Sequence, residues 1–406
     1  MVARLPIELV DLVVQYSATD TRAHLSTVSR GVYSISIRVL YSSILDMSVS
    51  RTIRCLLTLS RKPELALLVR SFSFYLSPSP NFLRPFLILL SRVLGNLHNL
   101  RTLTLQLGVP ITMNLLGQIS SRLTRLIYIH PFNGPHPASQ FLSNQTTIEE
   151  LLLVCQPSDL STLDSDALPA LKELAAPLWL LPNILPSRLP RLSQLTLLGI
   201  MNHPLEWFLL GVIIKFSLSN PLQSLELIVR AKISEKSMTT MATSPGLALL
   251  GLVAPFISSL TLDTYGHLIK QNELQNMIGL VLPHYPNLKT LIVTSQPPTP
   301  GACMYEPPPQ SAEVFSDILS SLHQQLLSMS DTLDNISNLF SAFLSRYSAP
   351  QAEPDQTQDQ STPLIDALHD GSCHLEIINA WRQIHPGLER VVFPVGAYLI
   401  RKNRNN

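Results

Sequence analysis

The stretch Leu100-Arg-Thr-Leu103-Thr-Leu105 decides how this chain of 406 residues is expected to fold. Its spacing is Leu-x-x-Leu-x-Leu, which places apolar side chains at positions 1, 4 and 6 of the motif. This spacing suits a short strand that enters a hydrophobic core and then lines it on alternate residues. Similar stretches recur at intervals of roughly 20 to 35 residues, which predicts a repeat array whose units bury their apolar edges by stacking.

The copies predict parallel strands, with a helix or an extended turn between successive strands. The expected strand motifs begin at Val69, Leu100, Leu123, Ile148, Leu171, Leu192, Leu222, Ile257, Leu288 and Leu388. We therefore expect the α/β class, with a curved solenoid that carries its strands on the concave face and its helices or turns outside.

Four segments follow from the spacing of apolar residues along the chain. Residues 1–46 have helical spacing and form a short, all-helical module; residues 47–296 carry the repeats after a connecting helix. Residues 297–363 form an insertion with proline-rich, helical and disordered parts, and residues 364–406 give a final helix, a terminal repeat strand and a basic tail.

The helical module has more apolar surface than three short helices can enclose. Leu9, Leu12, Val13 and Tyr16 form one stripe of its first helix. One interpretation is an exposed apolar surface that needs a partner. The alternative is that the module packs on the following repeats as an end cap.

Composition excludes several classes of partner. Charged residues make up 14% of the chain, hydrophobic residues 46%, and the formal net charge is +1. This balance favours neither nucleic acid nor an anionic membrane surface. The apolar run from Pro245 to Leu262 is a weak membrane candidate, because it contains two prolines and ends in another copy of the repeat.

The N-terminus and the cysteines bear on the compartment. The first residues carry Glu8 and Asp11 within their apolar run and show no signal-peptide pattern. The four cysteines lie far apart, which is typical of scattered thiols in a reducing compartment. We therefore expect a cytoplasmic or nuclear protein, or one found in both.

No catalytic signature is present in the sequence. It lacks a glycine-rich phosphate loop, a Gly-x-Ser-x-Gly elbow and a His-Glu-x-x-His motif. Cys373 and His374 are adjacent, and neighbours in sequence rarely face each other for nucleophilic activation. His130 and His136 lack further ligands at suitable spacing for a metal. The prediction is a binding protein, not an enzyme, with no cofactor and no metal.

Residues at positions 3, 5 and 7 of each motif point away from the core. Position 3 is polar throughout: Thr102, Arg125, Glu150, Glu173, Gln194, Ser224, Ser259 and Thr290. Positions 5 and 7 include apolar residues where water is expected: Ile127, Ile129, Leu152, Val154, Leu198, Ile228 and Ile292. Contiguous exposed apolar patches usually mark contact sites.

The target-binding hypothesis concerns two neighbouring repeats on the concave face. Its residues are Arg125, Ile127, Ile129, Glu150, Leu152 and Val154. The alternative is that the acidic insertion or another loop covers this patch. The opening copy, with Thr102, Thr104 and Gln106 outward, looks structural by comparison, so the contact surface is expected to begin at Arg125.

The helical module resembles a known family. It resembles the F-box, the adaptor-binding module of cullin-type ubiquitin ligases, in three short stretches. These are Leu5-Pro6-x-Glu8-Leu9 at its start, Val28-Ser29-Arg30 at its centre and Leu40-Tyr41 at its end. The polar segment 17–22 departs from the leucine-rich turn of many members. The whole arrangement is similar to that of F-box proteins with degenerate leucine-rich repeats from mushroom-forming fungi. This resemblance covers most of the chain, but only residues 1–46 carry motifs specific to the family.

The resemblance implies the substrate-recognition subunit of a Skp-cullin-F-box ubiquitin ligase. The helices would bind the Skp-type adaptor, which links to the cullin, and the repeats would bind an unknown protein substrate. The implied adaptor contacts are Leu5, Pro6, Ile7, Leu9, Val28 and Leu40. The alternative function is a leucine-rich-repeat scaffold without a ligase role, whose N-terminal helices only cap the repeats.

Overall fold

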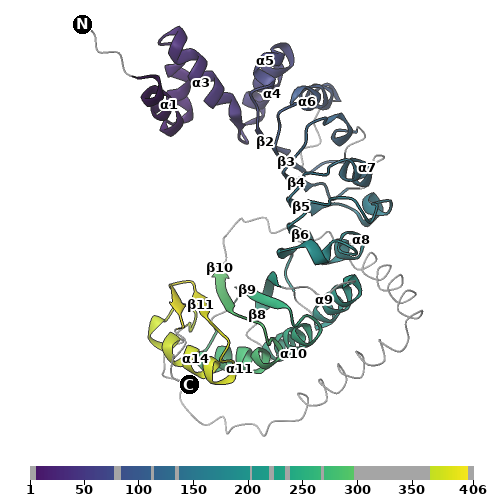
Figure 1. Ribbon diagram of the computed structural model, residues 1–406, viewed down its shortest axis with the longest axis vertical. Coiled ribbons are helices and arrows are strands. Elements are labelled where there is room, and N and C mark those ends of the chain that lie inside the picture. Colours follow the sequence, from purple (N-terminus) through teal and green to yellow (C-terminus); the bar gives the residue numbers. More distant parts are fainter. Residues whose placement is uncertain are drawn as a thin grey trace. The chain divides into compact units, whose positions relative to one another are not determined.

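A computed structural model describes residues 6–76, 84–110, 114–132, 137–201, 204–218, 224–233, 238–266, 269–296 and 366–400 (Figure 1). Leu5, His136, the expected insertion at 297–363 and the basic tail after residue 400 lie outside these ranges. The chain divides into two compact units, Met1–Lys172 and Glu173–Asn406, which are described separately.

The first unit begins with helices and continues with strands that alternate with helices or turns. Its helices are α1 (Ile7–Tyr16), α2 (Thr19–Leu25), α3 (Arg30–Ser42), α4 (Val49–Arg61), α5 (Pro63–Ala66), α6 (Arg84–Asn96) and α7 (Ala138–Ser143). Its strands are β1 (Ser43–Ile44), β2 (Ser71–Leu76), β3 (Thr102–Leu107), β4 (Arg125–Ile129) and β5 (Glu150–Val154). Short 3-10 helices span Leu116–Gln118 and Pro157–Leu160.

The second unit alternates strands and helices from its start. Its strands are β6 (Glu173–Pro177), β7 (Gln194–Leu198), β8 (Leu225–Ile233), β9 (Ile257–Gly266), β10 (Thr290–Gln296), β11 (Arg390–Phe393) and β12 (Gly396–Leu399). Its helices are α8 (Leu181–Ile184), α9 (Pro204–Ser217), α10 (Met238–Val253), α11 (Gln271–Val281) and α14 (Gly371–Ile384). Short 3-10 helices span Leu178–Leu180, Leu189–Arg191 and Leu282–His284.

The chain is mixed α/β, and its sheet is mostly parallel, as the sequence predicts. Within each unit the strands follow sequence order, β1 to β5 and β6 to β12, and only β12 is antiparallel to its neighbour. In the first unit, α4, α6 and α7 lie on one side of the strands (Figure 1). In the second unit, α9, α10, α11 and α14 likewise lie on one side of β8 to β11 (Figure 1).

The opening motif packs as its spacing predicts. Leu100, Leu103 and Leu105 are buried, whereas Thr102 and Thr104 between them are half-exposed. Each fully buried leucine contributes about 1.5 to 3 kcal/mol relative to an exposed one. One face of this strand is therefore buried in the core, and the side chains on its other face are partly exposed.

Backbone hydrogen bonds repeat at the residue after position 1 of each motif in the first unit. The N–H of Arg101 donates to the carbonyl of Arg70, and the N–H of Thr124 donates to that of Arg101, both at 2.8 Å. The N–H groups of Glu149 and Lys172 continue the series at 2.8 and 2.9 Å, each donating to the residue one repeat earlier. This ladder satisfies backbone groups at the point where each strand begins.

The register predicted for the repeat at Leu222 is wrong by two residues. Gln194 pairs with Glu226, and Glu226 pairs with Ser259, so position 3 of this repeat is Glu226 and not Ser224. A shift of two residues keeps every side chain on its face of the sheet, because side chains alternate with a period of two. Ile228 therefore still faces away from the core, at position 5 instead of position 7.

Glycines allow the helices of the second unit to approach closely. A Cβ on Gly246 of α10 would lie 2.5 Å from Cγ of Trp207 in α9. A Cβ on Gly251 would lie 2.6 Å from the ring of Tyr285, whose hydroxyl donates to the carbonyl of Leu247 at 2.7 Å. The repeats are thus held together by specific helix contacts as well as by the leucine motif.

The last described segment folds onto the end of the second unit. Asp370 caps α14 by accepting a hydrogen bond from the backbone N–H of Ser372 at 3.0 Å. Trp381 of α14 is fully buried and donates from Nε1 to the carbonyl of Gln275 in α11 at 3.2 Å. The sequence predicted this helix and β11, but it did not predict the antiparallel β12.

No helix among the described residues is both long enough and apolar enough to cross a membrane. The run from Pro245 to Leu262 instead divides between α10 and β9, as part of the repeat pattern. Leu247, Leu249 and Leu250 of this run are buried against the rest of the second unit. The apolar character of this run is therefore accounted for by burial within the second unit.

Candidate protein-interaction site

The N-terminal module, α1 to α3, has a very small interior. Only Val14, Ile35 and Ser36 of its three helices are buried. Polar contacts also join its helices: Arg22 donates to the carbonyl of Val14 at 3.0 Å, and Arg38 donates to a carboxylate oxygen of Asp11 at 2.8 Å. The Arg38–Asp11 pair is solvent-exposed, so it contributes at most about 1 kcal/mol.

Large apolar side chains of this module face outward. The exposed ones are Ile7, Leu9, Leu12, Val13, Tyr16, Val28 and Tyr33. The four residues of the apolar stripe on the first helix are all exposed, and the one buried residue of this helix is Val14. Of the implied adaptor contacts, Pro6, Ile7, Leu9 and Val28 are exposed and Leu40 is half-buried. We call the seven exposed apolar residues the N-terminal apolar surface.

The expected target patch on β4 and β5 is brought together by the strand register. Arg125 pairs with Glu150, Ile127 with Leu152, and Ile129 with Val154. The Nε of Arg125 also lies 3.1 Å from a carboxylate oxygen of Glu150, so the two charges largely compensate each other.

Exposure divides the residues of this patch. Ile127, Ile129 and Leu152 are half-exposed, as a contact surface requires. Val154 is only 5% exposed, so the expectation that its side chain faces water is wrong, whereas target binding by the patch stays a prediction. Alternation along the strand predicts which face a side chain points to, but it does not predict what covers that face.

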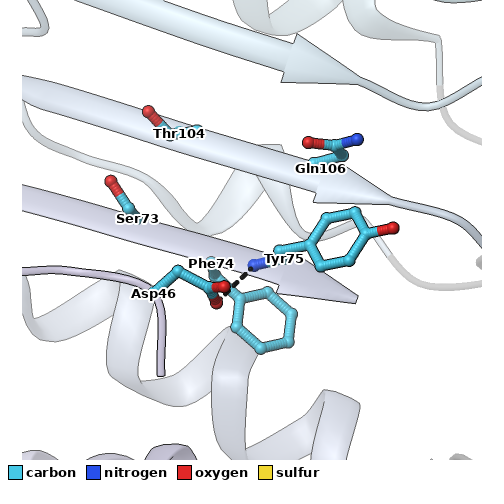
Figure 2. Close-up of a pocket in the computed structure, with 6 residues that line it drawn as sticks. All are labelled: Asp46, Ser73, Phe74, Tyr75, Thr104 and Gln106. Carbon is cyan, nitrogen blue, oxygen red and sulfur yellow. Dashed lines mark hydrogen bonds between the residues drawn. The ribbon is translucent and has the colours of Figure 1, made fainter. Parts of the chain in front are cut away.

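A hollow of about 380 Å³ lies over the middle and carboxyl-terminal parts of β2 and β3 (Figure 2). We call it the polar hollow for its polar side chains, although apolar atoms make up the larger part of its exposed lining. Its lining consists of Asp46, Ser73, Phe74, Tyr75, Thr104 and Gln106. The side chains of Ser73, Thr104 and Gln106 lie on the open face of the strands, and the ring of Tyr75 stands at the rim (Figure 2). Asp46 joins them from the loop after β1 by accepting the backbone N–H of Tyr75 at 3.3 Å.

The sequence did not predict this hollow. Thr104 and Gln106 belong to the motif that looked structural, and Asp46 lies outside any repeat motif. The hollow lies one repeat before Arg125, where the contact surface is expected to begin. The outward alternation of polar residues in β2 and β3 was the available signal, whereas the place of Asp46 depends on a contact 29 residues along the chain.

Titratable groups gather at the ends of β4 and β5 without forming an activated site. Burial lowers the pKa of His130 and raises the pKa of Tyr128. Burial also holds the pKa of the Cys155 thiol well above its usual value, with a further contribution from Asp159. A thiol that stays protonated is a poor nucleophile, so this cluster does not support covalent chemistry.

The adjacent Cys373 and His374 point to different partners. The Sγ of Cys373 lies 3.1 Å from the carbonyl of Asp370, and burial raises the pKa of this thiol. The ring of His374 stacks on Phe393 at 4.0 Å and lies within hydrogen-bonding distance of the Tyr398 hydroxyl, 2.9 Å from Nδ1. Within the described ranges, no group of three or more His, Cys, Asp or Glu residues is arranged to hold a metal ion.

No family model matches the sequence, and no curated protein matches it significantly. The class defined by the structure is a mixed α/β chain whose mostly parallel strands carry repeated leucine motifs. Its notable surfaces are the N-terminal apolar surface, the half-exposed side chains on β4 and β5, and the polar hollow.

Proposed function

We propose that this chain is the substrate-recognition subunit of a Skp-cullin-F-box type ubiquitin ligase. The N-terminal module acts as an F-box that binds the Skp-type adaptor, and a leucine-rich-repeat solenoid binds the protein target. The chain itself performs no bond chemistry. It holds the target near the ubiquitin-loaded enzyme and so raises the effective concentration of the reacting groups.

The N-terminal apolar surface is the observation that carries the proposal. Seven large apolar side chains are exposed on a module with only three buried residues. Burial of such a side chain in an interface gains about 1.5 to 3 kcal/mol relative to water. A surface of this kind therefore favours association with a partner protein.

The alternative, a scaffold whose N-terminal helices only cap the repeats, fits these exposures less well. A capping module would place its apolar stripe against the first repeat. Leu9, Leu12 and Val13 are instead exposed within the same unit that contains β2 to β5. The polar segment 17–22 remains the feature that favours the alternative.

The repeated motif supports the solenoid part of the proposal. Successive strands are parallel and follow sequence order, and backbone hydrogen bonds recur at the same position of successive motifs. Asn99 and Asn287, which each precede the first leucine of a motif, donate their side-chain amides to backbone carbonyls of the preceding repeat at 2.7 and 2.9 Å. Such arrays present the outward strand positions to protein ligands.

Adaptor binding is tested by placing charges on the N-terminal apolar surface. The double variant Ile7→Asp, Val28→Asp changes residues that are 61% and 68% exposed, so the fold should be retained. We expect binding to a co-expressed Skp-type adaptor to fall at least about tenfold, because two apolar contacts are replaced by charges that would be desolvated. Co-purification and titration of the purified adaptor measure the effect.

Leu375→Asp provides the matched control, since Leu375 is 63% exposed on α14 in the other unit. This variant should bind adaptor like the wild type. Failure of the wild-type chain to retain adaptor, or undiminished binding by the double variant, would contradict the ligase role.

Target binding is tested on the half-exposed residues of β4 and β5. The double variant Ile127→Asp, Leu152→Asp should remain folded and should retain adaptor, but it should lose the target from affinity purification followed by mass spectrometry. Thr196→Asp with Thr261→Asp introduces the same charges at position 5 of two other repeats and serves as the control. A folded Ile127/Leu152 variant with an unchanged set of bound proteins would overturn this site.

A further inference from the structure

We infer that the polar hollow at β2 and β3 is a binding site for an arginine side chain of the target protein. The inference rests on the proposed function for its assumption of a protein target, and it adds the chemical group that the target presents. It concerns residues outside both the N-terminal apolar surface and the patch on β4 and β5.

The charge in the hollow has no counter-ion within the described part of the chain. Asp46 is exposed, and its Oδ1 accepts a hydrogen bond from the backbone N–H of Tyr75. The segments after β2 and β3, residues 77–83 and 108–116, contain no Lys, Arg, Asp or Glu in their sequence. They therefore supply no cation to neutralise Asp46 and no second acid to compete with it.

The surrounding groups suit a guanidinium better than an ammonium ion. Tyr75 is 44% exposed, and its ring stands at the rim beside Gln106 (Figure 2). A planar guanidinium stacks on an aromatic ring while its N–H groups donate to a carboxylate. The side-chain oxygens of Ser73, Thr104 and Gln106 add further acceptors on the same face of the strands.

The position of Asp46 is fixed by the backbone, which favours a preorganised site. Strand β1 pairs with β2 only at Ser71 and Phe72. After β1, Oδ1 of Asp46 accepts a hydrogen bond from the backbone N–H of Tyr75. This bond anchors the side chain and leaves Oδ2 for a ligand. Anchoring a side chain before binding lowers the entropy cost of recognition.

The test uses the purified full-length chain, without adaptor, and four short peptides, Ac-Gly-X-Gly-NH2 with X as arginine, citrulline, lysine or glutamate. Citrulline keeps the planar shape of arginine but carries no charge. Binding is followed by NMR titration of the backbone signals of Tyr75 and Gln106. Arginine should shift these signals most strongly, lysine less, and citrulline and glutamate at least about tenfold less than arginine, as expected for a charge-assisted and stacked contact.

Two variants assign the effect to the hollow. Asp46→Asn keeps an acceptor for the N–H of Tyr75 but removes the charge, so arginine affinity should fall about three- to tenfold and lose its salt dependence. Glu173→Gln removes an exposed charge at position 3 of β6 and should leave the titration unchanged. Equal shifts with arginine and citrulline, or an Asp46→Asn variant with wild-type affinity, would overturn the inference.

The titration is independent of the ligase proposal because no adaptor is present. Loss of adaptor binding in the Ile7/Val28 variant tests the N-terminal apolar surface alone. Failure of the arginine titration would remove the hollow from the recognition surface, whether or not the adaptor binds.

Discussion

Gly246→Ala is expected to lower the free energy of unfolding of the Glu173–Asn406 unit by about 2 kcal/mol, although alanine favours helices. The added Cβ would lie 2.5 Å from Cγ and 2.6 Å from Cβ of Trp207. Trp207 is 1% exposed, so its ring has no open space into which it can move. Helices α9 and α10 must therefore separate, and the cost of that separation exceeds the gain of about 1 kcal/mol in helix propensity.

Gly211→Ala is the matched control for this prediction. Gly211 also lies within a helix, α9, but a Cβ there meets only Val253 at 3.9 Å, an ordinary contact distance. This variant should be as stable as the wild type or more stable by up to about 1 kcal/mol. The two alanine substitutions are thus expected to have opposite signs.

Urea denaturation followed by tryptophan fluorescence measures both variants. All three tryptophans, Trp179, Trp207 and Trp381, lie in the second unit, so the signal reports on that unit alone. A Gly246→Ala protein with a midpoint at or above that of the wild type would show that the close approach of the two helices is not required.

Trp381→Ala is expected to cost about 3 to 5 kcal/mol, the range for truncation of a buried tryptophan. Trp381 is fully buried, and its ring centroid lies 5.9 Å from that of Phe393. The substitution also leaves the carbonyl of Gln275 without the donor that Trp381 provides. Helix α14 and β11 should lose their protection first, because this side chain joins them to α11.

Hydrogen exchange and circular dichroism measure this prediction, since the variant lacks one of the fluorescent groups. Leu375→Ala, on the exposed face of the same helix, should change stability by less than about 0.5 kcal/mol. If both variants lose stability to a similar small extent, the proposed role of Trp381 as the anchor of α14 is wrong.

Local spacing predicted the strands well because the leucine motif carries its own burial pattern. The expected motif starts at Leu100, Leu123 and Ile148 precede the observed strands by two residues each. The register predicted from Leu222 was wrong because Leu222, Leu225 and Leu227 fit the spacing of the motif by themselves. The true register depends on how β8 pairs with β7 and β9. The alternation of inward and outward side chains along this strand was nevertheless predicted correctly, because the shift is two residues.

Burial by distant segments was harder to predict. The apolar stripe of α1 is visible in the sequence, but a periodicity does not tell whether this chain or another protein covers it. Val154 shows the opposite error, since an outward position on a strand is covered in the folded chain. The hollow around Asp46 and Tyr75 depends on a loop that no local pattern fixes.

The antiparallel β12 limits how this protein can be lengthened. Within each unit, the other described strands meet their neighbours in the parallel sense, so that each new motif can stack on the one before it. At Phe393 the chain instead reverses through a tight turn and pairs Arg390 with Leu399. An engineered extra repeat should therefore be tolerated as an internal duplication, for example of residues 171–191, and rejected as an addition beside β12, where the stacking pattern has already ended.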